Sequence, residues 1–80
     1  MEGYIDHILL LREENQKLAY GIGKELAIID LNYLFERETL NGTVTRLKSL
    51  IDHIKRSFNK ESSKNIIEWI EREIEALTNN

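Results

Sequence analysis

The sequence predicts a small all-α protein, built either as an antiparallel bundle of four short helices or as a long helical hairpin broken at intervals. Apolar residues recur at helical spacing along most of the chain, and none of its 80 residues is proline. A chain of 9.4 kDa is too short for two domains, so residues 1–80 are expected to form a single helical domain. The broken hairpin would fold at Asn41-Gly42 and would require a dimer, because one thin chain cannot cover all of its apolar surface.

The first predicted helix covers residues 4–20. Its apolar residues recur at steps of four and three, with a polar residue at the one vacant step: Tyr4, Ile8, Leu11, Asn15 and Leu18. A single polar residue in such a stripe commonly fixes the register of a helix assembly, although an exposed position at the margin explains it equally well. Gly21 and Gly23 weaken the helix beyond it, and the pattern leaves open whether they form a loop or a bend.

The second predicted helix covers residues 24–39 and contains an unusually apolar segment. Between Leu26 and Phe35, eight of ten residues are apolar. That density is too high for a helix with one buried face, so we expect the segment to be central or to be covered by a partner. A buried strand is the alternative, but a single strand would find no neighbouring strand in this chain.

The third and fourth predicted helices cover residues 44–58 and 63–77. Asn41-Gly42 is typical of a left-handed helix stop, and Thr43 is a candidate N-cap for the helix that follows. Ser62 and Ser63 are candidates for the N-cap of the last helix. Both helices carry apolar stripes that predict one buried face each: Val44, Leu47, Ile51, Ile54 and Phe58 in the third, and Ile66, Ile67, Ile70, Ile74 and Leu77 in the fourth.

Charge is distributed unevenly along the chain. Residues 1–40 carry four basic and eight acidic side chains, residues 41–64 carry six and two, and residues 65–80 carry one and four. A basic third helix between acidic neighbours is typical of antiparallel helices whose flanks attract one another. The alternative is a face that contacts nucleic-acid phosphates, formed by Arg46, Lys48, Lys55 and Arg56. A net charge of −3 and the lack of a known DNA-binding motif make nucleic acid the less favoured partner.

The composition argues against catalysis. The sequence has no cysteine, no glycine-rich phosphate loop and no serine–histidine spacing of a known kind, so we expect no enzymatic activity, no metal and no cofactor. His7 and His53 each follow an aspartate, but adjacent residues on a helix point about 100° apart and cannot chelate one ion as a pair. The lack of cysteine, of a signal sequence and of a membrane span predicts a cytoplasmic protein with no membrane partner.

Large aromatic residues suggest how the protein acts. Trp69 lies at the margin of the last apolar stripe, and a marginal Trp together with Phe58 and Tyr33 is typical of an interface as well as of a core. These three residues are therefore candidate partner-binding residues.

Residues 47–77 also resemble a known family. Leu50-Ile51-Asp52 and, fourteen positions beyond, the run from Ile66 to Ile74 are similar to the helical hairpin of the Sda-type sporulation histidine-kinase inhibitors. The resemblance implies a non-enzymatic hairpin that docks on the helices of a sensor kinase. It would make Ile66 an apolar docking residue near the hairpin tip, supported by Ile67 and Ile70.

The sequence thus predicts a small regulatory protein that binds a helical protein partner through apolar helix faces, such as a sensor kinase, and forms a homodimer. Two alternatives remain, a regulator that contacts nucleic acid through the basic third helix and a purely homo-oligomeric assembly module.

Overall fold

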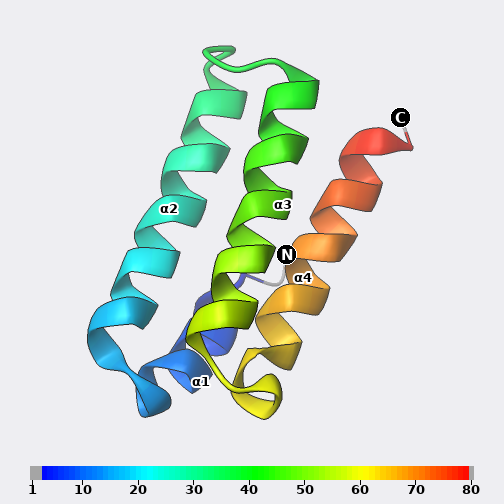
Figure 1. Ribbon diagram of the computed structural model, residues 1–80. Coiled ribbons are helices and arrows are strands. Elements are labelled where there is room, and N and C mark those ends of the chain that lie inside the picture. Colours follow the sequence, from blue (N-terminus) through cyan, green and yellow to red (C-terminus); the bar gives the residue numbers. More distant parts are fainter. Residues whose placement is uncertain (1–2, 80) are drawn as a thin grey trace.

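The computed structural model describes residues 3–79 and contains four helices: α1 (Ile5–Glu14), α2 (Gln16–Leu34), α3 (Leu40–Ser57) and α4 (Lys60–Thr78). This confirms the all-α prediction and the arrangement of four separate helices. The strand considered for Leu26–Phe35 is wrong, because all but the last of these residues are helical. The chain reverses between α2 and α3 at residues 35–39, before the predicted fold at Asn41-Gly42 (Figure 1).

The helices pack in a ring, each against two others. α1 contacts α2 and α4, while α3 contacts the same two helices, so α1 and α3 lie across one diagonal of the bundle. In Figure 1, α2, α3 and α4 run the length of the molecule and the short α1 lies behind their lower ends. A helix of ten residues spans about 15 Å and one of nineteen about 28 Å, so α1 covers only part of the others. The upper end of the bundle is therefore built from three helices.

The core forms from one apolar stripe per helix. Leu11 comes from α1, and the last two helices contribute the stripes that their spacing predicts. Gly23 lies where α1 approaches α2, since a β-carbon there would lie 3.8 Å from Ile8. The buried apolar residues of this core are Leu11, Ala19, Ile22, Leu26, Ile29, Leu47, Leu50, Ile51, Ile54, Phe58, Ile66, Trp69 and Ile70.

The N-caps of α3 and α4 lie at other residues than predicted, and the N-cap of α2 was not predicted. Asn15, Thr39 and Asn59 cap α2, α3 and α4, and each side chain accepts a hydrogen bond from the backbone N–H three residues on. Thr43 and Ser63, two of the predicted caps, are buried one turn inside their helices. Their hydroxyls donate to the carbonyls of Thr39 and Asn59 at 2.9 and 2.8 Å.

The two glycine-containing motifs are helical. Gly21 and Gly23 lie within α2 and form neither a loop nor a break. Ile22 between them is buried in the core. Asn15 ends α1 in an extended conformation, so the predicted first helix of residues 4–20 is divided there. Gly42 lies in the first turn of α3. Glu36, with φ 57°, is the left-handed residue of the α2–α3 connection.

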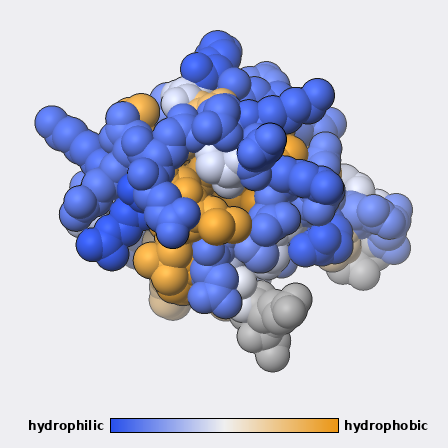
Figure 2. All heavy atoms as spheres, turned by 90° about the horizontal axis from the view of Figure 1, so that it is seen from below, coloured by the Kyte–Doolittle hydropathy of each residue, from blue (hydrophilic) through white to orange (hydrophobic). Residues whose placement is uncertain are grey.

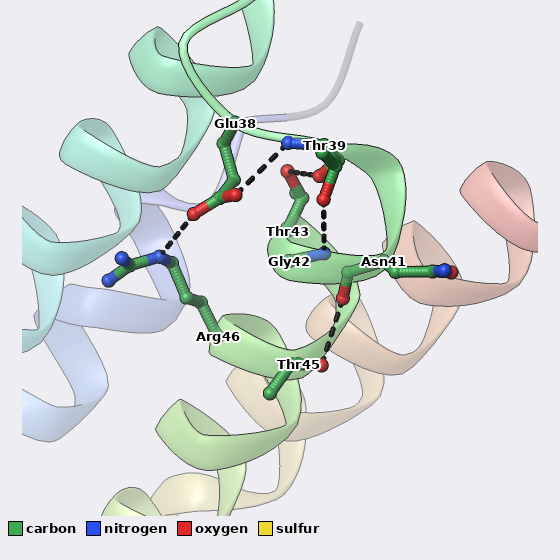
Figure 3. A network of polar contacts seen from close by, with 7 residues as sticks. All are labelled: Glu38, Thr39, Asn41, Gly42, Thr43, Thr45 and Arg46. Carbon is green, nitrogen blue, oxygen red and sulfur yellow. Dashed lines mark hydrogen bonds and ion pairs between the residues drawn. The ribbon is translucent and has the colours of Figure 1, made fainter.

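A polar network fixes the start of α3 (Figure 3). The Thr39 hydroxyl accepts from the Gly42 N–H at 3.0 Å, and the Glu38 carboxylate accepts from the Thr39 N–H at 3.0 Å. Arg46 donates to the same carboxylate at 2.9 Å. These hydrogen bonds hold the pKa of Glu38 below its usual range.

A second polar contact joins the ends of α1 and α4. The Glu14 carboxylate accepts from the Asn59 N–H at 3.1 Å and from the Ser62 hydroxyl. A carboxylate is favourable at this point because the N-terminus of α4 carries a partial positive charge.

Candidate protein-binding surfaces

Exposed large apolar side chains are confined to one half of the chain. Among the described residues, eleven are exposed, and all lie between residues 5 and 40: Ile5, Leu9, Leu10, Leu18, Tyr20, Ile28, Leu31, Tyr33, Leu34, Phe35 and Leu40. Residues 41–79 contain many large apolar side chains, but none in this exposed class. Apolar surface of this extent marks a place where a protein meets another molecule.

The outer face of α2 carries the largest share of this surface. We call it the α2 face and define it by Tyr20, Ile28, Leu31, Leu34 and Phe35. These residues lie on the side of the helix opposite Leu26 and Ile29, which are buried. The solvent-accessible surface of the whole chain is 5833 Å², above the roughly 5,000 Å² expected for a monomer of this mass.

An open groove runs between α1 and α2. It measures about 630 Å³ and is lined by Ile8, Arg12, Gln16, Lys17, Ala19 and Tyr20. Two more apolar residues, Ile5 and Leu9, lie four positions apart on α1 and so share a face of that helix. We call these two residues the α1 face. Figure 2, which views the bundle from below, shows apolar side chains gathered in one patch among hydrophilic ones.

The groove between α3 and α4 differs in chemistry. It measures about 940 Å³, and charged side chains of both signs surround its apolar part: Lys55, Phe58, Lys60, Glu61, Ser63, Lys64, Ile67, Glu68 and Glu71. Three basic and three acidic side chains offset one another there. This groove therefore presents no net charge to a partner.

Four of the five predicted partner-binding residues are in the core, which corrects their predicted role. Ile66 and Ile70 have none of their surface exposed, and Phe58 and Trp69 have 6% and 9%. Trp69 is covered by Tyr4, whose ring centroid lies 5.1 Å away. Tyr33 alone is exposed, at 41%. It continues the inner stripe of α2 at the end of the bundle that the short α1 does not cover, which explains its exposure.

The burial of Ile66 bears on the family resemblance. The resemblance assigns Ile66 to docking near the tip of a hairpin, and α3 and α4 do form an antiparallel hairpin. In this bundle, however, the side chain of Ile66 packs inward. A partner could contact it only if the bundle opened.

The four predicted phosphate-contacting residues do not form one face. Arg46 lies in the groove between α2 and α3 with Glu25 and pairs with Glu38, whereas Lys55 lies in the groove between α3 and α4. Lys48 and Arg56 are exposed on α3. Acidic side chains accompany the basic ones in both grooves, so the positive charge of the third helix is largely balanced locally.

Two carboxyl groups are partly desolvated at the end of the bundle that α1 leaves uncovered. Burial raises the pKa of Asp30 on α2 and of Glu73 on α4, and the charge of Asp30 raises the Glu73 pKa further. Burial, with the charge of Asp30, also raises the pKa of the Tyr4 hydroxyl. These groups lie close enough to influence one another, but no basic side chain forms an ion pair with either carboxylate among residues 3–79.

His7 and His53 are on different helices, α1 and α3, which lie diagonally across the bundle. Within the described part of the chain, no three metal-ligating side chains of the His, Cys, Asp or Glu type come together. In the same part, every helix is too short or too polar to cross a membrane.

No residue of the α2 face was a named partner-binding candidate, although the segment Leu26–Phe35 was expected to be central or covered by a partner. Its signal was present, because Tyr20, Leu31 and Leu34 follow a second helical stripe about half a turn from the core stripe. The density of apolar residues between Leu26 and Phe35 predicted surplus apolar surface without assigning the residues to two faces of the helix.

No protein-family model matches the chain, and no match was found among curated proteins or among solved structures.

Proposed function

We propose that this chain is a small non-enzymatic regulatory protein that uses the apolar faces of α1 and α2 to bind another helical protein and to form a homodimer. The observation that carries the proposal is that, among residues 3–79, all eleven exposed large apolar side chains lie between residues 5 and 40. The proposal requires no chemistry of the chain itself, only surface.

Physical arguments support binding as the purpose of this surface. Each apolar side chain moved out of water contributes about 25 cal/mol per Å², so eleven of them offer a partner several kcal/mol. A helix is the natural occupant of the groove between α1 and α2, because an amphipathic helix can lay its apolar face between two others. Arg12 and Lys17 on the rim of that groove favour a partner helix with acidic flanks.

The proposed place of action is the cytosol. A chain without cysteine forms no disulfide, so its fold does not depend on an oxidising compartment.

Co-purification with matched variants tests the proposal. The full chain, tagged at its C-terminus, is expressed in its native cell, and the proteins that it retains are identified. A retained protein is then purified and titrated with the chain by calorimetry. The variant Ile5→Ser/Leu9→Ser removes the α1 face, and the control Lys48→Ser/Asp52→Ser places two serines at the same spacing on an exposed part of α3 without removing apolar surface.

We expect the α1 variant to weaken the purified complex roughly 100-fold and the α3 variant to change it less than about 2-fold. Equal binding by both variants would contradict the proposal, as would a chain that retains no other protein. Retention of nucleic acid with an affinity that falls steeply with salt would favour the phosphate-contacting alternative instead.

A further inference from the structure

The exposed apolar residues of α2 are arranged like the seam of a coiled coil. Positions 20, 24, 27, 31 and 34 are separated by alternating steps of four and three, which keeps them in line along one side of the helix. They are Tyr20, Lys24, Ala27, Leu31 and Leu34, and the α2 face residues Ile28 and Phe35 flank them. A seam of this kind is complementary to another helix with the same spacing.

We infer that a second copy of this chain covers the α2 face, with the two α2 helices antiparallel about a two-fold axis near Ala27 and Ile28. This inference rests on the homodimer in the proposed function and names the surface and orientation that form it. It leaves the α1 face free for the other protein.

The area of the α2 face suits a stable dimer. Its residues are exposed by 73% at Tyr20, 42% at Ile28, 52% at Leu31, 72% at Leu34 and 66% at Phe35. That amounts to roughly 600 Å² of side chain per copy, or roughly 1,200 Å² for a pair, above the roughly 1,000 Å² that a specific interface needs. A face of this kind is also self-complementary, as a two-fold interface requires.

Charge selects the antiparallel orientation. The two cations within α2, Lys17 and Lys24, are exposed and lie in its N-terminal half. In a parallel pair, each of these lysines would lie beside the same lysine of the other copy, and the two like charges would repel each other. In an antiparallel pair, Lys17 lies beside the C-terminal end of the other α2, which carries partial negative charge and has no basic residue in its last turn.

The two-fold axis also fixes which residues meet. Residues whose numbers add to about 55 lie opposite each other, so Lys24 of one copy faces Leu31 of the other, and Tyr20 faces Phe35. The alkyl stem of Lys24 can cover Leu31 while its ammonium group reaches water. The small side chain of Ala27 near the axis lets the two helices approach closely.

Sedimentation equilibrium of the full chain measures the pairing directly. We expect a mass of twice 9.4 kDa at high concentration and dissociation to 9.4 kDa on dilution. A mass of 9.4 kDa throughout the micromolar to millimolar range would overturn the inference.

A charge-reversal pair tests both the surface and the orientation. Leu31→Lys places a second cation opposite Lys24 of the other copy, and we expect it to raise the dissociation constant by roughly 100-fold or more. Adding Lys24→Glu to this variant restores opposite charges across the seam in the antiparallel pair only, and we expect it to recover at least 10-fold. Leu9→Lys, a matched change on α1, should leave the dissociation constant unchanged. Failure of the second substitution to restore the dimer would overturn the orientation.

Single cysteines give an independent readout, because the native chain has none. Ala27→Cys lies at the axis, so we expect it to form a disulfide with the same cysteine of the other copy under mild oxidation. Leu34→Cys lies seven residues from the axis, and an antiparallel pair separates the two thiols by about 20 Å along the helices, which prevents the link. A rapid link at position 34 with none at position 27 would overturn the antiparallel seam.

The outcomes separate this inference from the proposed function. A dimer that Leu31→Lys leaves intact overturns the α2 seam but keeps a homodimer. A monomer that still binds a helical protein through the α1 face overturns the seam and the homodimer but keeps the binding function. A monomer without any partner overturns both.

Discussion

The two hairpins of this bundle differ in how they use their apolar residues. In α3 and α4, these residues fall on one side of each helix, which is buried or half-buried, and among the large apolar side chains described there only Leu40, at the start of α3, is exposed. In α1 and α2, they are spread around the helix, so the core takes one stripe and leaves a second exposed. The difference supports the proposal that α1 and α2 serve binding as well as folding.

The first prediction compares equal substitutions in the two hairpins. Ile66→Asp in α4 places a carboxylate where no side-chain surface is exposed, and we expect it to cost at least about 4 kcal/mol, which is most of the stability of so small a domain. Tyr20→Asp in α2 should change stability by less than about 0.5 kcal/mol. Urea denaturation in dilute solution, where the chain is monomeric, measures both. Similar losses of stability at the two positions would show that Tyr20 is buried as fully as Ile66.

The second prediction compares the two faces of α2 itself. Leu26→Ala removes a side chain that is fully buried and should destabilise the chain by about 3 kcal/mol. Leu31→Ala on the α2 face should cost less than about 0.5 kcal/mol in the monomer but weaken the dimer. Thermal unfolding at low and high protein concentration separates the two effects. A large loss from Leu31→Ala in the monomer would mean that the α2 face is already covered within the chain.

The third prediction concerns the start of the second hairpin. Thr39→Ala removes the oxygen that accepts from the Gly42 N–H, and we expect a loss of about 1 kcal/mol in urea denaturation. Thr45→Ala serves as the control, because its hydroxyl donates within the helix to the carbonyl of Asn41 and caps nothing. We expect that change to be neutral or slightly stabilising. The reverse order of effects would contradict Thr39 as the cap of α3.

The fourth prediction compares two helical glycines, Gly21 in α2 and Gly42 in α3. A β-carbon at Gly21 would meet no atom within 4 Å, so Gly21→Ala should stabilise the chain by about 1 kcal/mol through its higher helix propensity. Gly42→Ala should gain less, because its β-carbon would displace the Glu38 side chain from its place beside Arg46. Thermal unfolding of the two variants checks this. Destabilisation by Gly21→Ala would show that α2 is not a continuous helix there.

The smallest effect is the pH dependence of the open end of the bundle. The pKa values of Asp30 and Glu73 are raised in the folded chain, so the folded state binds protons more readily than the unfolded state. Stability contributed by these two groups therefore increases as the pH falls from about 7 to about 5. Asp30→Asn should reduce that increase, measured by urea denaturation at the two pH values. If stability in this variant changes with pH as much as in the native chain, Asp30 does not cause the pH dependence.

The helical spacing predicted the core of the second hairpin almost completely. Leu47, Ile51, Ile54 and Ile70 are all buried, because a stripe at steps of three and four can face only one way once a helix forms. The dense segment from Leu26 to Phe35 likewise predicted apolar surface beyond what one core can hold, and the exposure of Leu31 and Leu34 accords with that.

The helix ends and the burial of the aromatic residues could not be predicted from the spacing of apolar residues. Thr39 and Thr43 stand one turn apart, and both fit a cap by type, so the choice depends on where the chain turns after Phe35. Trp69 is covered by Tyr4, which lies far from it in the sequence, and only the packing of α1 against α4 brings the two together. Asn15 became a helix start rather than part of a seam, because α1 must fold back on α2 to cover Ile22.

Thiol labelling of single-cysteine variants measures how much of each hairpin's apolar surface is open to water. In dilute solution, a cysteine at Leu34 should react at a rate close to that of an unfolded peptide, and a cysteine at Ile66 should react at least about 100-fold more slowly, because only unfolding exposes it. Comparable protection at both positions would contradict the claim that the first hairpin leaves apolar surface for a partner while the second buries its own.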